Sequence, residues 1–91
     1  MVRGTSLAEL LERHNELRFQ FASTELDLAL TFCKRAISAM EEATADRNAK
    51  NATRAYESAM RTLGNLSLDG HPEIAVKLTR LSEILPRVLD R

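Results

Sequence analysis

The sequence predicts an all-α protein, an antiparallel three-helix bundle with a long N-terminal helix. Between Thr5 and Leu63 there is neither Gly nor Pro, and the good helix formers Ala, Leu, Glu, Arg and Met dominate this stretch. Apolar residues along it recur at spacings of three and four, which is typical of one face of a helix. A four-helix up-and-down bundle is the alternative, because Ser23 and Thr24 could cap a further helix inside the first segment.

The length and composition indicate one folded domain over residues 1–91. A chain of 91 residues supports a single hydrophobic core, and 44% hydrophobic with 29% charged residues is typical of a folded chain rather than a disordered one. The 13 basic and 13 acidic residues cancel, which argues against general binding of nucleic acid or of an anionic membrane. The richest apolar stretch, Leu26 to Cys33, is far shorter than the ~20 residues of a membrane-spanning helix. The sequence therefore predicts no membrane association.

The cysteine content indicates the compartment. The single cysteine, Cys33, cannot form an internal disulfide, and no charged start leads into an apolar targeting segment. We therefore expect a cytoplasmic protein.

The first helix is predicted over about residues 6–44. Ser6 and Glu9 fit a capping box. In this motif the serine hydroxyl accepts a hydrogen bond from a backbone N–H of the first turn, and the glutamate side chain accepts one from the backbone N–H of the serine. No turn residue occurs from Arg18 to Ser23, so one continuous helix is favoured over two. Such a helix would be ~58 Å long and would project or find a partner.

Two apolar faces are predicted on this helix. One contains Leu7, Leu10, His14, Leu17, Phe21 and Leu28. The other contains Leu26, Leu30, Cys33, Ile37 and Met40, with alanines every seven residues beside it at positions 22, 29, 36 and 43. If the last helix turns back onto the hairpin of residues 24–63, the first face is left exposed over its N-terminal part, and such a surface usually marks an interface. Leu7, Leu10, His14, Leu17 and Phe21 are therefore the candidate interface of a homodimer.

The remaining boundaries follow from turn residues. A tight turn is predicted near Ala45 to Asn48, and a second helix over about 47–63 that ends at Gly64 or Asn65. Asp69 and Gly70 form a turn pair, and Pro72 suits the first position of a last helix over about 72–90. The buried face of that helix is predicted to contain Ile74, Leu78, Leu81, Leu85 and either Val88 or Leu89.

No catalytic, cofactor-binding or metal-binding residues are predicted, and we do not expect an enzyme. The sequence contains no glycine-rich phosphate loop, no paired-carboxylate signature and no Cys/His metal spacing. His14 is interpreted as a core or interface histidine, and Cys33 as a small core residue.

A basic row on the second helix gives the alternative function. Arg47, Lys50, Arg54 and Arg61 are predicted to lie opposite Tyr56 and Met60. Such a row could bind an anionic ligand or a nucleic-acid backbone, although a solvated helix face is the simpler interpretation.

One helix resembles a known repeat. Ala52, Tyr56 and Ala59 have the small, aromatic, small spacing of the second helix of a tetratricopeptide repeat, and the same segment is similar to part of the microtubule-interacting-and-trafficking domain. Both are peptide-binding scaffolds, so the resemblance implies interaction rather than chemistry. The sequence therefore favours a protein-protein interaction or assembly module that associates with itself or with a protein partner.

Overall fold

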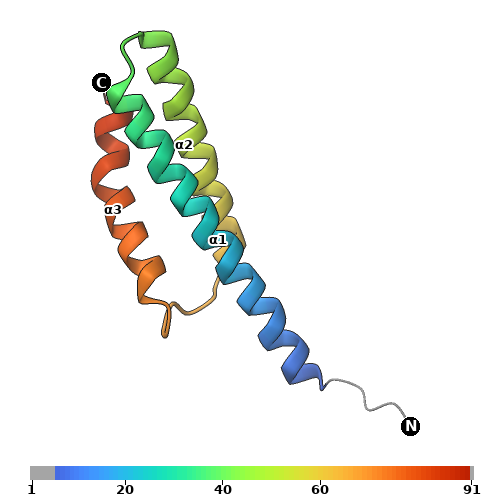
Figure 1. Cartoon of the computed structure of the whole chain (residues 1–91). Helices are drawn as coiled ribbons and strands as arrows, with labels where there is room; N and C mark the ends of the chain where they lie inside the picture. The colour runs from blue at the N-terminus through green and yellow to red at the C-terminus, as the bar shows by residue number, and fades with distance from the viewer. Residues whose placement is uncertain (1–5, 91) are drawn as a thin grey trace.

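Three α-helices account for the secondary structure of residues 6–90, the part of the chain that the computed structural model describes (Figure 1). They are α1 (Leu7–Ser38), α2 (Glu42–Leu63) and α3 (Pro72–Leu89). α1 and α2 form an antiparallel hairpin, and α3 returns alongside them in the direction of α1 (Figure 1). This confirms the all-α three-helix prediction with its long N-terminal helix, and the four-helix alternative is not needed.

α1 begins as the sequence predicts and continues without a break. The backbone N–H of Glu9 donates to Ser6 Oγ at 3.1 Å, which is the serine half of the capping box. The possible break at Ser23 and Thr24 does not occur. Thr24 Oγ1 instead donates to the carbonyl of Gln20 within the helix at 3.1 Å. The helix therefore spans 32 residues, about 48 Å at 1.5 Å per residue.

The reversal between α1 and α2 lies earlier than predicted. The sequence placed the first helix over 6–44 and the turn near Ala45 to Asn48, but α1 ends at Ser38 and α2 begins at Glu42. Ala39 is in an extended conformation and ends α1. The reversal at 39–41 brings Ala45 and Ala49 into the core, where both are buried. Tertiary packing thus overrides the local helix propensity of this segment.

The contact between α1 and α2 is a seam of small side chains. On α1 the buried positions follow alternating steps of four and three, and on α2 six positions are buried, five of them alanine. These residues are Ala22, Leu26, Ala29, Cys33 and Ala36 of α1, and Ala45, Ala49, Ala52, Ala55, Ala59 and Leu63 of α2. Small side chains at a helix contact allow the two helix axes to lie close together. The predicted heptad of alanines is confirmed at 22, 29 and 36, whereas Ala43 lies in α2 and is exposed.

α3 supplies the larger side chains of the core. Ile74, Leu81 and Val88 are buried, and Val88 rather than Leu89 occupies the last core position. Gly64 ends α2 with a φ of 51°, and Gly70 has a φ of 83° in the predicted turn before Pro72. Both glycines adopt a backbone conformation that other residues rarely do. The predicted limits of α3 are therefore confirmed to within one residue.

The second predicted face of α1 holds only in part. Leu26 and Cys33 are buried and Leu30 is partly buried against the core, but Ile37 and Met40 are exposed. Ile37 lies in the last turn of α1, and Met40 lies in the connection to α2. Both therefore sit at the end of the hairpin. None of the helices in residues 6–90 is long and apolar enough to span a membrane.

Candidate interaction surface

A row of exposed apolar residues follows one side of α1, and we call it the α1 stripe. Its apolar members are between 42% and 72% exposed, and His14 among them is also exposed. The α1 stripe consists of Leu7, Leu10, His14, Leu17, Phe21 and Leu28. The exposure expected for the five candidate interface residues is therefore present.

The α1 stripe is separate from the seam because of helix geometry. Phe21 directly precedes the buried Ala22, and Leu28 directly precedes the buried Ala29. Successive residues of an α-helix point about 100° apart, so the stripe lies on the side of α1 next to the seam. α2 and α3 pack on other sides of α1 and leave this one uncovered.

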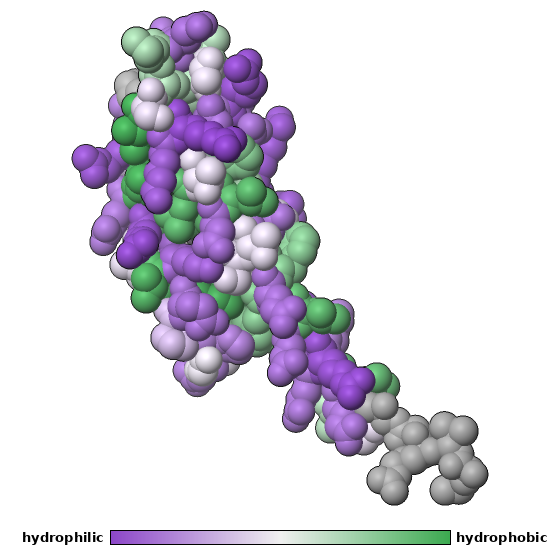
Figure 2. Space-filling model, viewed as in Figure 1, coloured by the Kyte–Doolittle hydropathy of each residue, from purple (hydrophilic) through white to green (hydrophobic). Residues whose placement is uncertain are grey.

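The first part of α1 extends beyond the other two helices (Figure 1). Arg18 contacts the last residues of α2, and the buried positions of α1 begin at Ala22. We therefore call residues 7–17 the arm. Green, apolar side chains lie along the edge of the arm in the space-filling view, next to purple, hydrophilic ones (Figure 2). Leu11 is also exposed there, so the arm presents four exposed leucines.

Two hydrogen bonds and one pair of stacked rings hold α1 where the arm leaves the bundle. Arg18 Nε donates to the carbonyl of Thr62 at 2.8 Å, and Arg18 Nη2 donates to the carbonyl of Leu63 at 3.3 Å. The ring of Phe19 stacks on the ring of His71, with centroids 3.7 Å apart. These contacts tie α1 to the end of α2 and to the start of α3. The base of the arm is therefore attached on two sides.

A polar pocket of about 460 Å³ adjoins the Phe19 and His71 rings. Glu16 and Glu73 line it, and His71 Nδ1 lies 3.5 Å from Glu73 Oε1. In residues 6–90 no group of three or more His, Cys, Asp or Glu side chains is placed to hold a metal ion. The pocket is a polar recess on the side of α1 where α3 begins.

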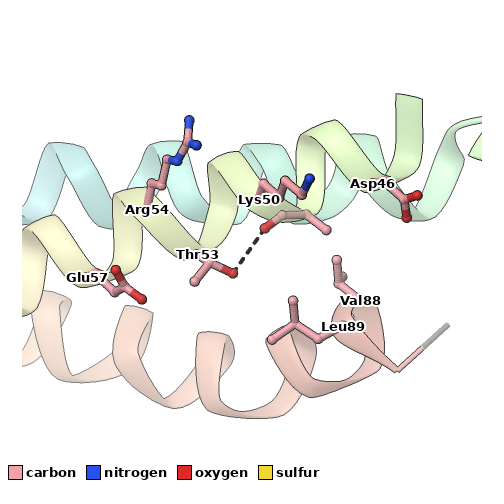
Figure 3. A pocket seen from close by; sticks show the side chains of 8 residues that line it. Asp46, Lys50, Thr53, Arg54, Glu57, Val88 and Leu89 are labelled. Atoms are coloured by element: carbon pink, nitrogen blue, oxygen red, sulfur yellow. Dashed lines mark hydrogen bonds between the residues drawn. The ribbon is translucent and has the colours of Figure 1, made fainter. Parts of the chain in front are cut away.

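The predicted basic row lies on the exposed face of α2. Arg47, Lys50, Arg54 and Arg61 are all exposed. Lys50 and Arg54 line a groove of about 400 Å³ between α2 and the end of α3, together with Asp46 and Glu57 (Figure 3). In this close-up Arg54 points away from α3. The two carboxylates reduce the positive potential of the row, because charges on neighbouring helix turns interact.

Cys33 is fully buried in the seam, as expected of a small core residue. Burial raises the pKa of its thiol, because a thiolate is poorly solvated there. The nucleophilic form is thus disfavoured in the folded protein.

Several contacts of the structure have no counterpart in the sequence interpretation. The contacts of Arg18 with α2 and of Phe19 with His71 join residues that are more than forty positions apart in the sequence. No local pattern indicates them. A small apolar groove of about 160 Å³ between α2 and α3, lined by Tyr56, Leu81 and Leu85 among others, was also missed. Only the aromatic character of Tyr56 on an otherwise alanine-rich face could have indicated it.

The segment that resembles a tetratricopeptide-repeat helix forms the middle of α2, with Ala52 and Ala59 buried and Tyr56 half-buried. Comparison of the chain with protein-family models, with curated proteins and with solved structures gave no match.

Proposed function

We propose that the protein is an interaction or assembly module that forms a homodimer through the α1 stripe. The observation that carries the proposal is the row of exposed leucines and Phe21 on a helix that extends beyond its own bundle. Large apolar side chains that are gathered on one helix side usually mark an interface. We further propose a cytoplasmic location, because the chain has one cysteine, which is free and buried.

The energetics favour a partner for the α1 stripe. Full burial of one Leu or Phe side chain contributes roughly 1.5–3 kcal/mol. Leu10, Leu17 and Phe21 are each at least half exposed, so an interface that covers them has a substantial driving force. Helix-to-helix association through such a row needs a partner with the same spacing, and a second copy of the chain provides it.

The test is the mass of the chain in solution. We expect light scattering at micromolar concentration to give the mass of two chains. The double variant Leu10→Glu with Leu17→Glu should give the mass of one chain, because four carboxylates would be desolvated in the dimer. Ala8→Glu is the matched control, since Ala8 is an exposed arm residue outside the α1 stripe. A wild-type chain that remains monomeric at micromolar concentration would contradict the proposal.

Anion binding through Arg47, Lys50, Arg54 and Arg61 is the second candidate. Their common exposed face supports it, and the nearby Asp46 and Glu57 weaken it. If it holds, the protein should be retained on a heparin or nucleic-acid matrix at low salt and released as salt rises. Replacing Lys50 and Arg54 with Gln should abolish that retention, whereas replacing Arg80 and Arg87 of α3 with Gln should not.

A further inference from the structure

The α1 stripe follows a seven-residue repeat. Its residues alternate steps of three and four from Leu7 to Phe21, and the repeat continues through the exposed Thr24 to Leu28. This spacing is that of the contact positions of a two-stranded coiled coil. His14 and Thr24 are the two polar members between apolar ones. The order of apolar and polar members limits how two copies can pair.

We infer that the second copy of α1 runs antiparallel, with Arg13 of each chain beside Asp27 of the partner subunit. This inference rests on the dimer proposed above and specifies its geometry. In the register that places Leu17 opposite Phe21 of the partner subunit, Leu10 lies opposite Leu28 of the partner subunit. His14 then lies opposite Thr24 of the partner subunit. From residue 10 to residue 28, apolar residues meet apolar ones and polar residues meet polar ones, and Leu7 lies opposite Thr31 of the partner subunit.

Flanking charges distinguish the two orientations. In a parallel pair, Arg13 of each chain would lie beside Arg18 of the partner subunit, so Arg13 would have no opposite charge to pair with. In the antiparallel register each Arg13 lies beside Asp27 of the partner subunit, which gives two opposite-charge contacts. Arg18 meets its own copy near the two-fold axis, but its guanidinium is directed to the carbonyls of Thr62 and Leu63. Charge therefore favours the antiparallel pair.

Asp27 is accessible for this contact. Its side chain is 61% exposed, and Oδ1 lies 3.0 Å from Lys77 Nζ. A carboxylate has two oxygens and accepts from more than one donor. Arg13 is exposed on the arm. The intersubunit pair thus adds to the Lys77 contact and does not replace it.

The shape of the chain is compatible with this register. The arm extends past α2 and α3, so an antiparallel partner meets the arm where no other helix packs. Each arm then lies along the exposed side of α1 of the partner subunit near its Phe21 and Leu28. The two bundles sit at opposite ends of the shared helix pair.

Charge reversal tests the orientation. We expect Arg13→Glu alone and Asp27→Arg alone to weaken the dimer roughly tenfold, since each replaces two attractive contacts with two repulsive ones. A mixture of the two variants should form heterodimers with about wild-type affinity, because both intersubunit pairs are again of opposite charge. Arg47→Glu, on the exposed face of α2, should leave the affinity unchanged. Sedimentation velocity at several concentrations gives the dimer affinity of wild type, of the three variants and of the mixture.

Disulfide trapping gives an independent readout. In a Cys33→Ala background, Leu10→Cys and Leu28→Cys chains should cross-link to each other on mixing and oxidation, and neither should cross-link to itself. An Arg13→Glu dimer tighter than wild type, or a Leu10→Cys chain that cross-links to itself, would establish a parallel pair and overturn the inference. A wild-type monomer would instead refute the proposed dimer as a whole.

Discussion

Arg18 of α1 caps the C-terminal end of α2, because its Nε donates to the carbonyl of Thr62 at 2.8 Å. Its Nη2 also donates to the carbonyl of Leu63 at 3.3 Å. The last carbonyls of a helix have no partner within the helix and carry a partial negative charge. The cationic guanidinium satisfies two of them and joins α1 to α2 where the arm begins.

Arg18→Met should therefore destabilise the fold. The methionine keeps most of the aliphatic stem but removes both donors. A hydrogen bond that involves a charged group contributes about 1.5–3 kcal/mol to stability. We expect the free energy of unfolding to fall by roughly that amount in urea titrations. Arg80→Met is the control, because Arg80 is an exposed arginine of α3 outside the α1 stripe. Equal stability of the two variants would show that the Arg18 contacts contribute nothing.

Gly64→Ala should be more destabilising than Gly70→Ala. Both glycines have positive φ, which costs a residue with a Cβ roughly 1–2 kcal/mol. A Cβ at Gly64 would in addition lie 3.0 Å from Arg18 Nη2, whereas one at Gly70 would have no atom within 4 Å. Thermal unfolding should show a larger decrease in Tm for Gly64→Ala. The difference should shrink in an Arg18→Met background, and a difference that persists there would point away from the Arg18 contact.

Local signals in the sequence predicted much of the fold. Ser6, Gly64 and Pro72 mark helix limits because capping and turn chemistry involve only neighbouring residues. The α1 stripe was predicted as one helix face from its spacing, and its exposure was predicted on the condition that the last helix turns back onto the hairpin. The reversal at 39–41 was not, because Ala39 and Met40 are good helix formers and only the packing of distant alanines decides where the chain turns.

The contacts at the base of the arm could not be predicted from the sequence. Arg18 and Leu63 are 45 residues apart, and Phe19 meets His71 only because α3 begins beside α1. Such pairs depend on the relative placement of helices, on which a single sequence carries no local signal. The basic row was predicted correctly as an exposed face, but the groove that Lys50 and Arg54 form with Val88 and Leu89 of α3 appears only in three dimensions.

Ala52→Leu tests the close contact between α1 and α2. Ala52 is fully buried in the seam, and three added carbons would force the helices apart or the side chain out of its preferred rotamer. We expect a loss of roughly 1–3 kcal/mol in the free energy of unfolding. Ala43→Leu, at an exposed position of the same helix, should change it little. If urea titrations show no loss for Ala52→Leu, the close packing of α1 against α2 at Ala52 is contradicted.

Alkaline pH should weaken the fold through Cys33. Burial raises the pKa of this thiol in the folded protein, whereas the unfolded chain has the ordinary value of about 8.5. The contribution of the neutral thiol to stability is therefore fully present below that value and is lost as the pH rises toward the higher folded pKa. Cys33→Ala removes the group, so the stability of wild type relative to Cys33→Ala should decrease above about pH 8.5. Urea titrations of both proteins across that range measure the difference.

Thiol labelling tests the burial of Cys33 directly. A thiol reagent at neutral pH should label wild type only after denaturant is added. Rapid labelling of the folded chain, or parallel pH profiles for the two proteins, would contradict a buried thiol with a raised pKa.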